Sequence, residues 1–312
     1  MKKKNNILII GQGTIGTFLG ATLSGNENSI VHLVREDSKI RDKITLNFND
    51  RRNKPFRLPK GKQYDYAVTN NLNDIQSFSE IIVAVSHNQI SNVLSMFSPS
   101  LQPNQTIVVM GNVWNDFDWI EQNIKTPYIF VFPNFGGAIV SNKLEGWLTP
   151  NFTSGVTNSK YQNNLIEFST LLSKNGFKPK EEKDIKGWLM THFAYNTGML
   201  LESANQNGFQ KMTKSWTSLK TMYSLIRECM CVVNKLNVET QTFKEGRIAF
   251  QPIWWNALKT YFMFLIPGLA KSADASKDIE EWRSYGQKIY NTSQNLDLAP
   301  PLLTLNYKNK NK

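Results

Sequence analysis

Three glycines near the N-terminus have the spacing of a phosphate-binding turn, G-x-G-x-x-G. In such a turn the first glycine permits a sharp bend, the second lets the backbone approach a pyrophosphate, and the third lets a helix pack closely on a strand. The N-terminus of the following helix attracts the negative charge of the phosphates. We therefore expect a dinucleotide to be bound by the whole segment, which comprises Gly11, Gln12, Gly13, Thr14, Ile15 and Gly16.

The residue that should select the dinucleotide is Arg35, which directly follows the apolar run Ile30–Val34. Sites for NAD usually place Asp or Glu after the second strand of this unit to bind the ribose 2′-hydroxyl, whereas a guanidinium suits the 2′-phosphate of NADP. The sequence therefore favours NADP(H) as the cofactor. Two acidic neighbours, Glu36 and Asp37, keep NAD open as the alternative, and a solvent-exposed loop cation is the alternative role for Arg35.

The elements around the glycine turn alternate between strands and helices. Ile7–Ile10 is wholly apolar, as expected of a strand buried on both faces of a parallel sheet. Apolar residues then recur at helical spacing up to a stop at Gly25-Asn26, after which the second strand follows. This order predicts an α/β, Rossmann-type fold with a doubly wound parallel sheet. Further strands are expected at Tyr64–Val68, Ile81–Val85, Thr106–Met110 and Tyr128–Phe132, with helices at Gln89–Phe97 and Asp116–Asn123.

The strand pattern disappears from Asp184 onward, and the spacing of apolar residues in the remaining chain predicts helices. We expect an NADP-binding Rossmann domain at 1–182 and an all-α domain at 183–312 that serves substrate binding or dimerisation. The cleft between two such domains is the default place for an active site. The expected helices are Tyr161–Asn175 and, after a charged connection at Phe177–Glu182, Trp188–Leu201, Ser215–Leu236, Trp254–Leu265 and Lys277–Leu296.

Composition limits the classes of partner. The net charge of +11 invites a nucleic-acid interpretation, but six of the 36 Lys and Arg residues lie in polar terminal segments. The other 30 basic residues are largely balanced by 25 acidic residues, and no helix is rich in arginine. Nucleic acid is therefore not an expected partner. The two cysteines, Cys229 and Cys231, provide no disulfide framework, and no cluster of histidines joins them into a metal site.

Two apolar segments resemble targeting or membrane segments only superficially. The first lies near the N-terminus and is interrupted by the glycines of the turn, which the core helix of a signal peptide would tolerate poorly. The second, Tyr261–Leu265, is ended by Pro267 and is far shorter than a membrane span. We therefore expect a cytoplasmic protein without a membrane partner.

These features resemble the ketopantoate reductase family, which reduces 2-dehydropantoate to pantoate with NADPH. Ile7–Arg35 looks like the opening βαβ unit of that family, including its basic residue after the second strand. The family has a strand followed by Lys-x-x-Gln, and here Ser86-His87-Asn88-Gln89 keeps the glutamine but lacks the lysine. The family also has an Asn-Gly beside the nicotinamide. Here Asn112 supplies the asparagine and Val113 replaces the glycine, so the resemblance assigns Asn112 to cofactor and substrate binding.

The resemblance extends to the catalytic residues of the helical domain. The family's catalytic lysine falls on His192, and the substrate-binding asparagine four residues later falls on Asn196. A second family asparagine falls on Leu200. The glutamate of the last long helix corresponds to Glu280, six residues before Gly286. The fold and cofactor therefore carry over, whereas the specificity for ketopantoate does not follow from these residues.

A mechanism follows from these assignments. Reduction of a carbonyl by hydride leaves a developing alkoxide that needs a proton donor. A protonated His192 could replace the lysine, and a neighbouring Glu280 would favour the protonated imidazole. The predicted activity is the NADPH-dependent reduction of a small 2-oxo acid to a 2-hydroxy acid.

Several alternatives stay open at this point. A catalytically silent NADP(H)-binding protein, acting as a sensor or assembly component, is the alternative function, in which His192 has no chemical role. Asn112 and Asn196 would then be capping or surface residues. His32 is expected to be packed inside the second strand, and His87 to line the cofactor cleft. The oligomeric state is open, with a homodimer as one option.

Overall fold

The structure is a computed structural model that describes residues 5–24, 28–35, 42–266, 268–275 and 277–307. The chain divides into two compact units, Met1–Ile185 and Lys186–Lys312. The division falls close to residue 182, where the strand pattern of the sequence ends. Each unit is described by itself below.

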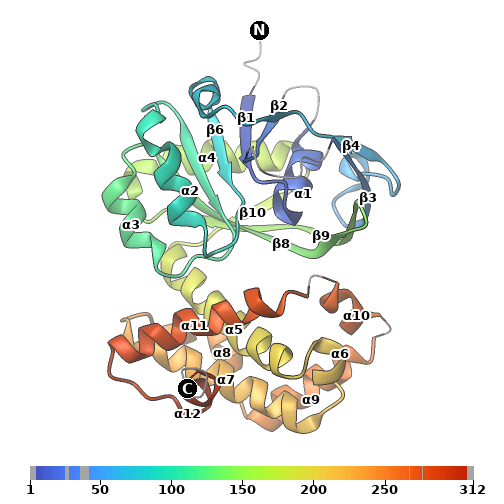
Figure 1. Ribbon diagram of the computed structural model, residues 1–312, viewed down its shortest axis with the longest axis vertical. Coiled ribbons are helices and arrows are strands. Elements are labelled where there is room, and N and C mark those ends of the chain that lie inside the picture. Colours follow the sequence, from blue (N-terminus) through green and yellow to red (C-terminus); the bar gives the residue numbers. More distant parts are fainter. Residues whose placement is uncertain (1–4, 25–27, 36–41, 267, 276, 308–312) are drawn as a thin grey trace. The chain divides into compact units, whose positions relative to one another are not determined.

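The first unit is built on one sheet whose parallel part has the strand order β5-β2-β1-β6-β7-β8 (Figure 1). The order reverses direction at β1, which lies between β2 and β6, as in doubly wound nucleotide-binding sheets. The predicted α/β Rossmann-type fold is therefore confirmed. The strands are β1 (Asn5–Ile10), β2 (Asn28–Leu33), β5 (Val68–Thr69), β6 (Glu80–Val83), β7 (Thr106–Met110) and β8 (Tyr128–Val140).

Helices cover both faces of this sheet. On one face, Phe18 of α1 (Thr14–Leu23) and Leu165 of α4 (Gln162–Lys174) share a core with Ile7 and Ile9 of β1. On the other face lie α2 (Ile90–Phe97) and α3 (Asp116–Asn123), which pack against each other. Because successive side chains of a strand point to opposite faces, burial on both sides explains the wholly apolar runs in the sequence.

Three further strands continue the same sheet beyond β8. The antiparallel strand β9 (Lys143–Gly155) pairs with β8, β3 (Lys43–Asp50) pairs with β9, and β4 (Gln63–Asp65) pairs with β3. The prediction of a single strand at Tyr64–Val68 is therefore wrong. Tyr64 and Asp65 belong to β4, whereas Val68 is the first residue of β5. The charged connection predicted at Phe177–Glu182 contains the edge strand β10 (Lys178–Glu181), whose side chains are mostly exposed.

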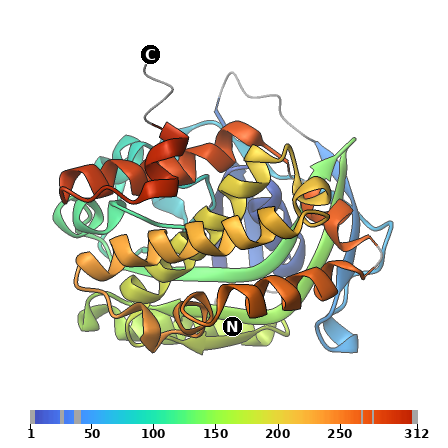
Figure 2. The same cartoon turned by 90° about the horizontal axis from the view of Figure 1, so that it is seen from below.

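The second unit is all-α, as predicted (Figure 2). Its central helix, α7, begins after Ser215, whose side chain caps it by accepting a hydrogen bond from Ser218 N at 3.2 Å. Helix α7 packs against α8, α9, α11 and α12. Within the described part of the chain, no helix combines the length and apolar character needed to cross a bilayer. The helices are α5 (Ile185–Asn205), α6 (Phe209–Met212), α7 (Trp216–Lys235), α8 (Lys244–Ala249), α9 (Ile253–Phe264), α10 (Leu269–Asp274), α11 (Ile279–Asn295) and α12 (Pro301–Tyr307).

Candidate functional site

The glycine turn has the geometry of a phosphate cradle. Gly11 directly follows β1 and has a φ of 110°, which only glycine adopts readily, and Gly13 is the N-cap of α1. A Cβ built on Gly16 would lie 2.5 Å from the carbonyl oxygen of Gly11, so this glycine is required for the packing of α1 on the turn. A Cβ on Gly13 would meet no protein atom within 4 Å. The space in front of Gly13 is therefore open to a ligand phosphate at the N-terminus of α1.

A buried polar network supports the turn from behind. His32 Nδ1 lies 3.0 Å from the carbonyl oxygen of Gly11, and His32 Nε2 lies 2.9 Å from the Tyr64 hydroxyl. Because a carbonyl only accepts, Nδ1 carries the proton of a neutral imidazole, and Tyr64 donates to Nε2. Burial lowers the pKa of His32 to about 4 and raises the pKa of Tyr64. The prediction that His32 is packed is confirmed, and its additional role is to hold the first glycine of the turn.

The network predicts a specific loss of stability in acid. Below pH 6.5 the unfolded chain protonates His32, whereas the folded protein keeps it neutral down to a pKa of about 4. The unfolded state therefore binds more protons in this window, and the free energy of unfolding falls as the pH falls. His32→Gln removes this titration, so the fall between these pH values should be about 3 kcal/mol smaller in the variant than in the parent. Urea unfolding at several pH values measures the difference, and parallel curves would contradict it.

The carboxyl ends of three central strands meet beside the turn. A Cβ on Gly11 would lie 3.2 Å from the carbonyl oxygen of Ala84, which follows β6, and a Cβ on Gly111, which follows β7, would lie 4.0 Å from Ile15. Asn112 comes next in the chain, so it lies near the start of α1. Doubly wound sheets bind their ligands at this edge.

A cavity of about 510 Å³ opens beyond the ends of β1 and β2. Its walls are mostly apolar, with Leu72, Val93 and Met96 among them, and Arg35 and Asn70 are its polar members. Apolar walls suit a flat base, and the guanidinium suits a phosphate on the adjoining ribose. The residues present therefore fit an adenine dinucleotide. Glu36 and Asp37, on which the NAD alternative depends, lie outside the described residues.

In the helical unit, His192 has a partner on each ring nitrogen. Nδ1 lies 2.8 and 3.0 Å from the two carboxylate oxygens of Glu245, and Nε2 lies 2.9 Å from Asn196 Nδ2. Trp188 stacks on the imidazole with a centroid distance of 5.0 Å and an interplanar angle of 5°. Trp188, His192 and Asn196 are four residues apart on α5 and therefore share one face. His192 and Glu245 keep 14% and 28% of their side chains exposed, so the group is accessible from solvent.

The carboxylate hydrogen-bonded to His192 is Glu245, which the sequence analysis did not single out, and the role predicted for Glu280 stays a prediction. Glu245 lies in the first turn of α8, whereas Glu280 is an exposed residue in the first turn of α11. With the Asn196 amide oriented as in the structure, the hydrogen bonds assign the protons of the ring. The amide nitrogen of Asn196 is a donor, so Nε2 accepts and Nδ1 carries the proton that Glu245 accepts. A neutral imidazole with Nδ1 held by a carboxylate can exchange a second proton at Nε2.

The sequence model of the family "Ketopantoate reductase PanE/ApbA" matches residues 7–146. The curated protein sequences give no significant match.

Similar solved structures include 2-dehydropantoate 2-reductase from Porphyromonas gingivalis W83, with 13% identity, a TM-score of 0.68 and 99% of each chain covered. A dimeric ketopantoate reductase from Staphylococcus aureus has 15% identity and a TM-score of 0.67, with 97% of this chain and 96% of that chain covered. A D-mandelate dehydrogenase in complex with NADH has 15% identity and a TM-score of 0.71, with 96% of each chain covered. The N-terminal part of the chain is thus similar to the ketopantoate reductase family, and the chain shares the fold of these solved structures along nearly its whole length.

Proposed function

We propose that the protein is an NADPH-dependent oxidoreductase that reduces the carbonyl of a small 2-oxo acid to a 2-hydroxy acid. The observation that carries the proposal is the arrangement around His192. By its resemblance to the family this histidine corresponds to the catalytic lysine, and Glu245 and Asn196 lie at its two ring nitrogens. A carboxylate on Nδ1 is the partner that orients an imidazole for proton transfer at Nε2. Consumption of NADPH with a panel of 2-oxo acids is the experiment that tests the activity.

The N-terminal unit supplies the residues that would hold the cofactor. The turn from Gly11 to Gly16, with Gln12, Thr14 and Ile15 in it, would bind the pyrophosphate through its backbone N–H groups. Arg35 would bind the 2′-phosphate, and Asn112 would orient the nicotinamide or the substrate oxygens. Bound NADPH supplies the hydride.

His192 would supply the proton. In the protonated ring, Nδ1–H would donate to Glu245 and Nε2–H would lie beside Asn196. Donation of the Nε2 proton to the developing alkoxide would leave a neutral imidazole with its proton on Nδ1. Asn196 can accept from the protonated ring through its amide oxygen and donate to the neutral ring through its amide nitrogen. Asn196 would thereby stay hydrogen-bonded to Nε2 in both protonation states of the ring. It would also orient the substrate oxygen beside that nitrogen.

Arg35→Ala should erase most of the preference for NADPH over NADH. A charge-assisted hydrogen bond to the 2′-phosphate contributes about 1.5–3 kcal/mol, so NADPH affinity should fall about ten- to a hundredfold. NADH has no 2′-phosphate, and its affinity serves as the internal control that should not change. Titration of each cofactor against both proteins measures the preference. Equal affinities for NADPH and NADH in the parent would contradict the assignment.

Glu245→Gln should slow the reduction by at least about a hundredfold without changing NADPH affinity. The carboxylate fixes the imidazole with its proton on Nδ1, and an amide can present either an oxygen or an NH₂ group to that nitrogen. Imidazole ¹⁵N spectra should therefore show His192 protonated on Nδ1 in the parent and a mixture of tautomers in the variant. Glu280→Gln is the matched control, because Glu280 is exposed and lies on a different helix. If the two variants behaved alike, Glu245 would not be a positioning residue.

A further inference from the structure

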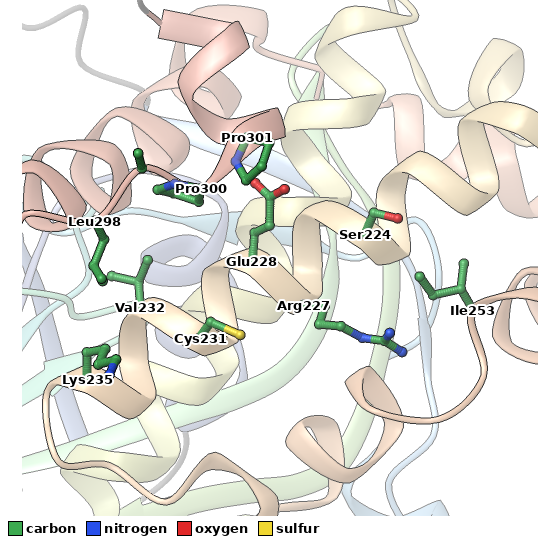
Figure 3. Close-up of a pocket in the computed structure, with 11 residues that line it drawn as sticks. Ser224, Arg227, Glu228, Cys231, Val232, Lys235, Ile253, Leu298, Pro300 and Pro301 are labelled. Atoms are coloured by element: carbon green, nitrogen blue, oxygen red, sulfur yellow. The ribbon is translucent and has the colours of Figure 1, made fainter.

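The helical unit contains a second cavity, which includes none of the residues assigned to the reaction (Figure 3). It has a volume of about 500 Å³ and lies between α7 and the segment that leads into α12. Most of its lining surface is apolar and comes from Val232, Ile253, Leu298, Pro300 and Pro301. Cavities of this size bind small organic molecules.

Two cations lie at this cavity, on one face of α7. Arg227, Cys231 and Lys235 are spaced four residues apart, so they follow one another along the helix. Arg227 donates to the carbonyl oxygens of Ala249 and Gln251, at 3.2 and 2.8 Å. Its partners are therefore neutral, and among the described residues neither Arg227 nor Lys235 forms an ion pair. An apolar cavity with two uncompensated cations is suited to a ligand that carries a negative charge.

The acidic residue of the cavity, Glu228, is already engaged. Its two carboxylate oxygens accept hydrogen bonds from the backbone N–H groups of Leu302 and Leu303, at 3.0 and 2.9 Å, in the first turn of α12. Figure 3 shows its side chain directed toward Pro301, while the thiol of Cys231 lies between Arg227 and Lys235. Glu228 therefore stabilises the fold, and within the described part of the chain it leaves the two cations without a carboxylate partner.

We propose that this cavity binds a small amphipathic carboxylic acid. The apolar body lies against Val232, Ile253 and the two prolines, and the carboxylate lies at Lys235, with Arg227 adding a second positive charge farther along the cavity. The apolar contacts supply the affinity, and the cations select an anion over a neutral molecule of equal size. This site is separate from His192, so it does not depend on the proposed reductase activity.

Cys231 provides a reporter of occupancy at this cavity. Its side chain is exposed, whereas Cys229 is fully buried, so a neutral maleimide should alkylate Cys231 alone. Octanoate is a suitable probe below its micellar concentration. At ten times its Kd it should slow alkylation of Cys231 about tenfold, because only the unoccupied cavity reacts. Intact-protein mass spectrometry follows the rate, and peptide mapping verifies the modified residue.

Matched lysine variants test the role of charge. Lys235→Gln should raise the octanoate concentration for half-protection about three- to tenfold, because it removes one of the two cations. Lys220→Gln, on the same helix but outside the cavity, should leave that concentration unchanged. Arg227 is less suitable for the test because it also holds Ala249 at the end of α8, the helix that carries Glu245.

Two results would overturn the proposal. Unchanged alkylation at millimolar octanoate would show that the cavity does not bind the acid. Equal protection by 1-octanol and octanoate, with no effect of Lys235→Gln, would show that the cations do not select a carboxylate. Either result can be read whether or not the protein reduces a 2-oxo acid.

Discussion

His192→Ala should slow the reduction of the 2-oxo acid by about 10²- to 10⁴-fold, the usual contribution of a positioned proton donor. The affinity for NADPH should stay nearly unchanged, because the residues assigned to the cofactor lie in the other unit. The expected loss therefore falls in kcat and not in cofactor binding. Steady-state kinetics combined with a cofactor titration separates the two quantities.

His192→Lys is the matched replacement for this experiment, since it restores the residue type that the family uses. It should retain measurable reduction, because a protonated lysine at this position can also donate a proton. Free imidazole added to His192→Ala should recover part of the lost rate if the cavity left by the ring admits it. If His192→Ala reduced the substrate at the rate of the parent, His192 would have no role in proton transfer.

Gly13→Val should abolish NADPH binding, with at least about a hundredfold loss of affinity, and leave the fold intact. The backbone at Gly13 has φ −71° and ψ −178°, which a valine adopts without strain, and a Cβ there meets no protein atom within 4 Å. The valine would instead occupy the space that the pyrophosphate needs. Calorimetric titration with NADPH and thermal unfolding measure the two expectations.

Gly16→Ala is the control that separates ligand contact from packing. Its Cβ would lie 2.5 Å from the carbonyl oxygen of Gly11, so this variant should lose stability before any ligand is added. Gly13→Val should keep the stability of the parent. Normal NADPH affinity in Gly13→Val would mean that the glycine turn has a structural role only.

The sequence predicted the parallel core well because its strands are buried on both faces. Runs such as Ile7–Ile10 and Ile107–Met110 are wholly apolar and differ clearly from the helices between them. The added strands β3 and β9 have a weaker signal. In β3, buried Ile44, Leu46 and Phe48 alternate with more exposed residues, which is typical of a strand with one face toward the core. That alternation was the available signal for β3.

The catalytic group was predictable only in part. His192 and Asn196 share one face of a long helix, so their proximity follows from spacing alone. Glu245 lies 53 residues from His192, on a helix of six residues that is too short for a periodic pattern. No local signal distinguishes Glu245 from Glu280, because their placement depends on how α8 and α11 pack in the helical unit. The contact of His32 with the glycine turn also required the fold, since it joins residues from two strands.

The most direct test of the proposed function is steady-state oxidation of NADPH by the parent protein with a panel of 2-oxo acids that includes 2-dehydropantoate. We predict that at least one acid is reduced, that a 2-hydroxy acid forms in equal amount to the NADPH consumed, and that His192→Ala loses this activity. If neither the parent nor His192→Lys reduced any acid of the panel while NADPH bound tightly, the reductase proposal would be contradicted, and the protein would be a silent NADP(H)-binding member of its fold.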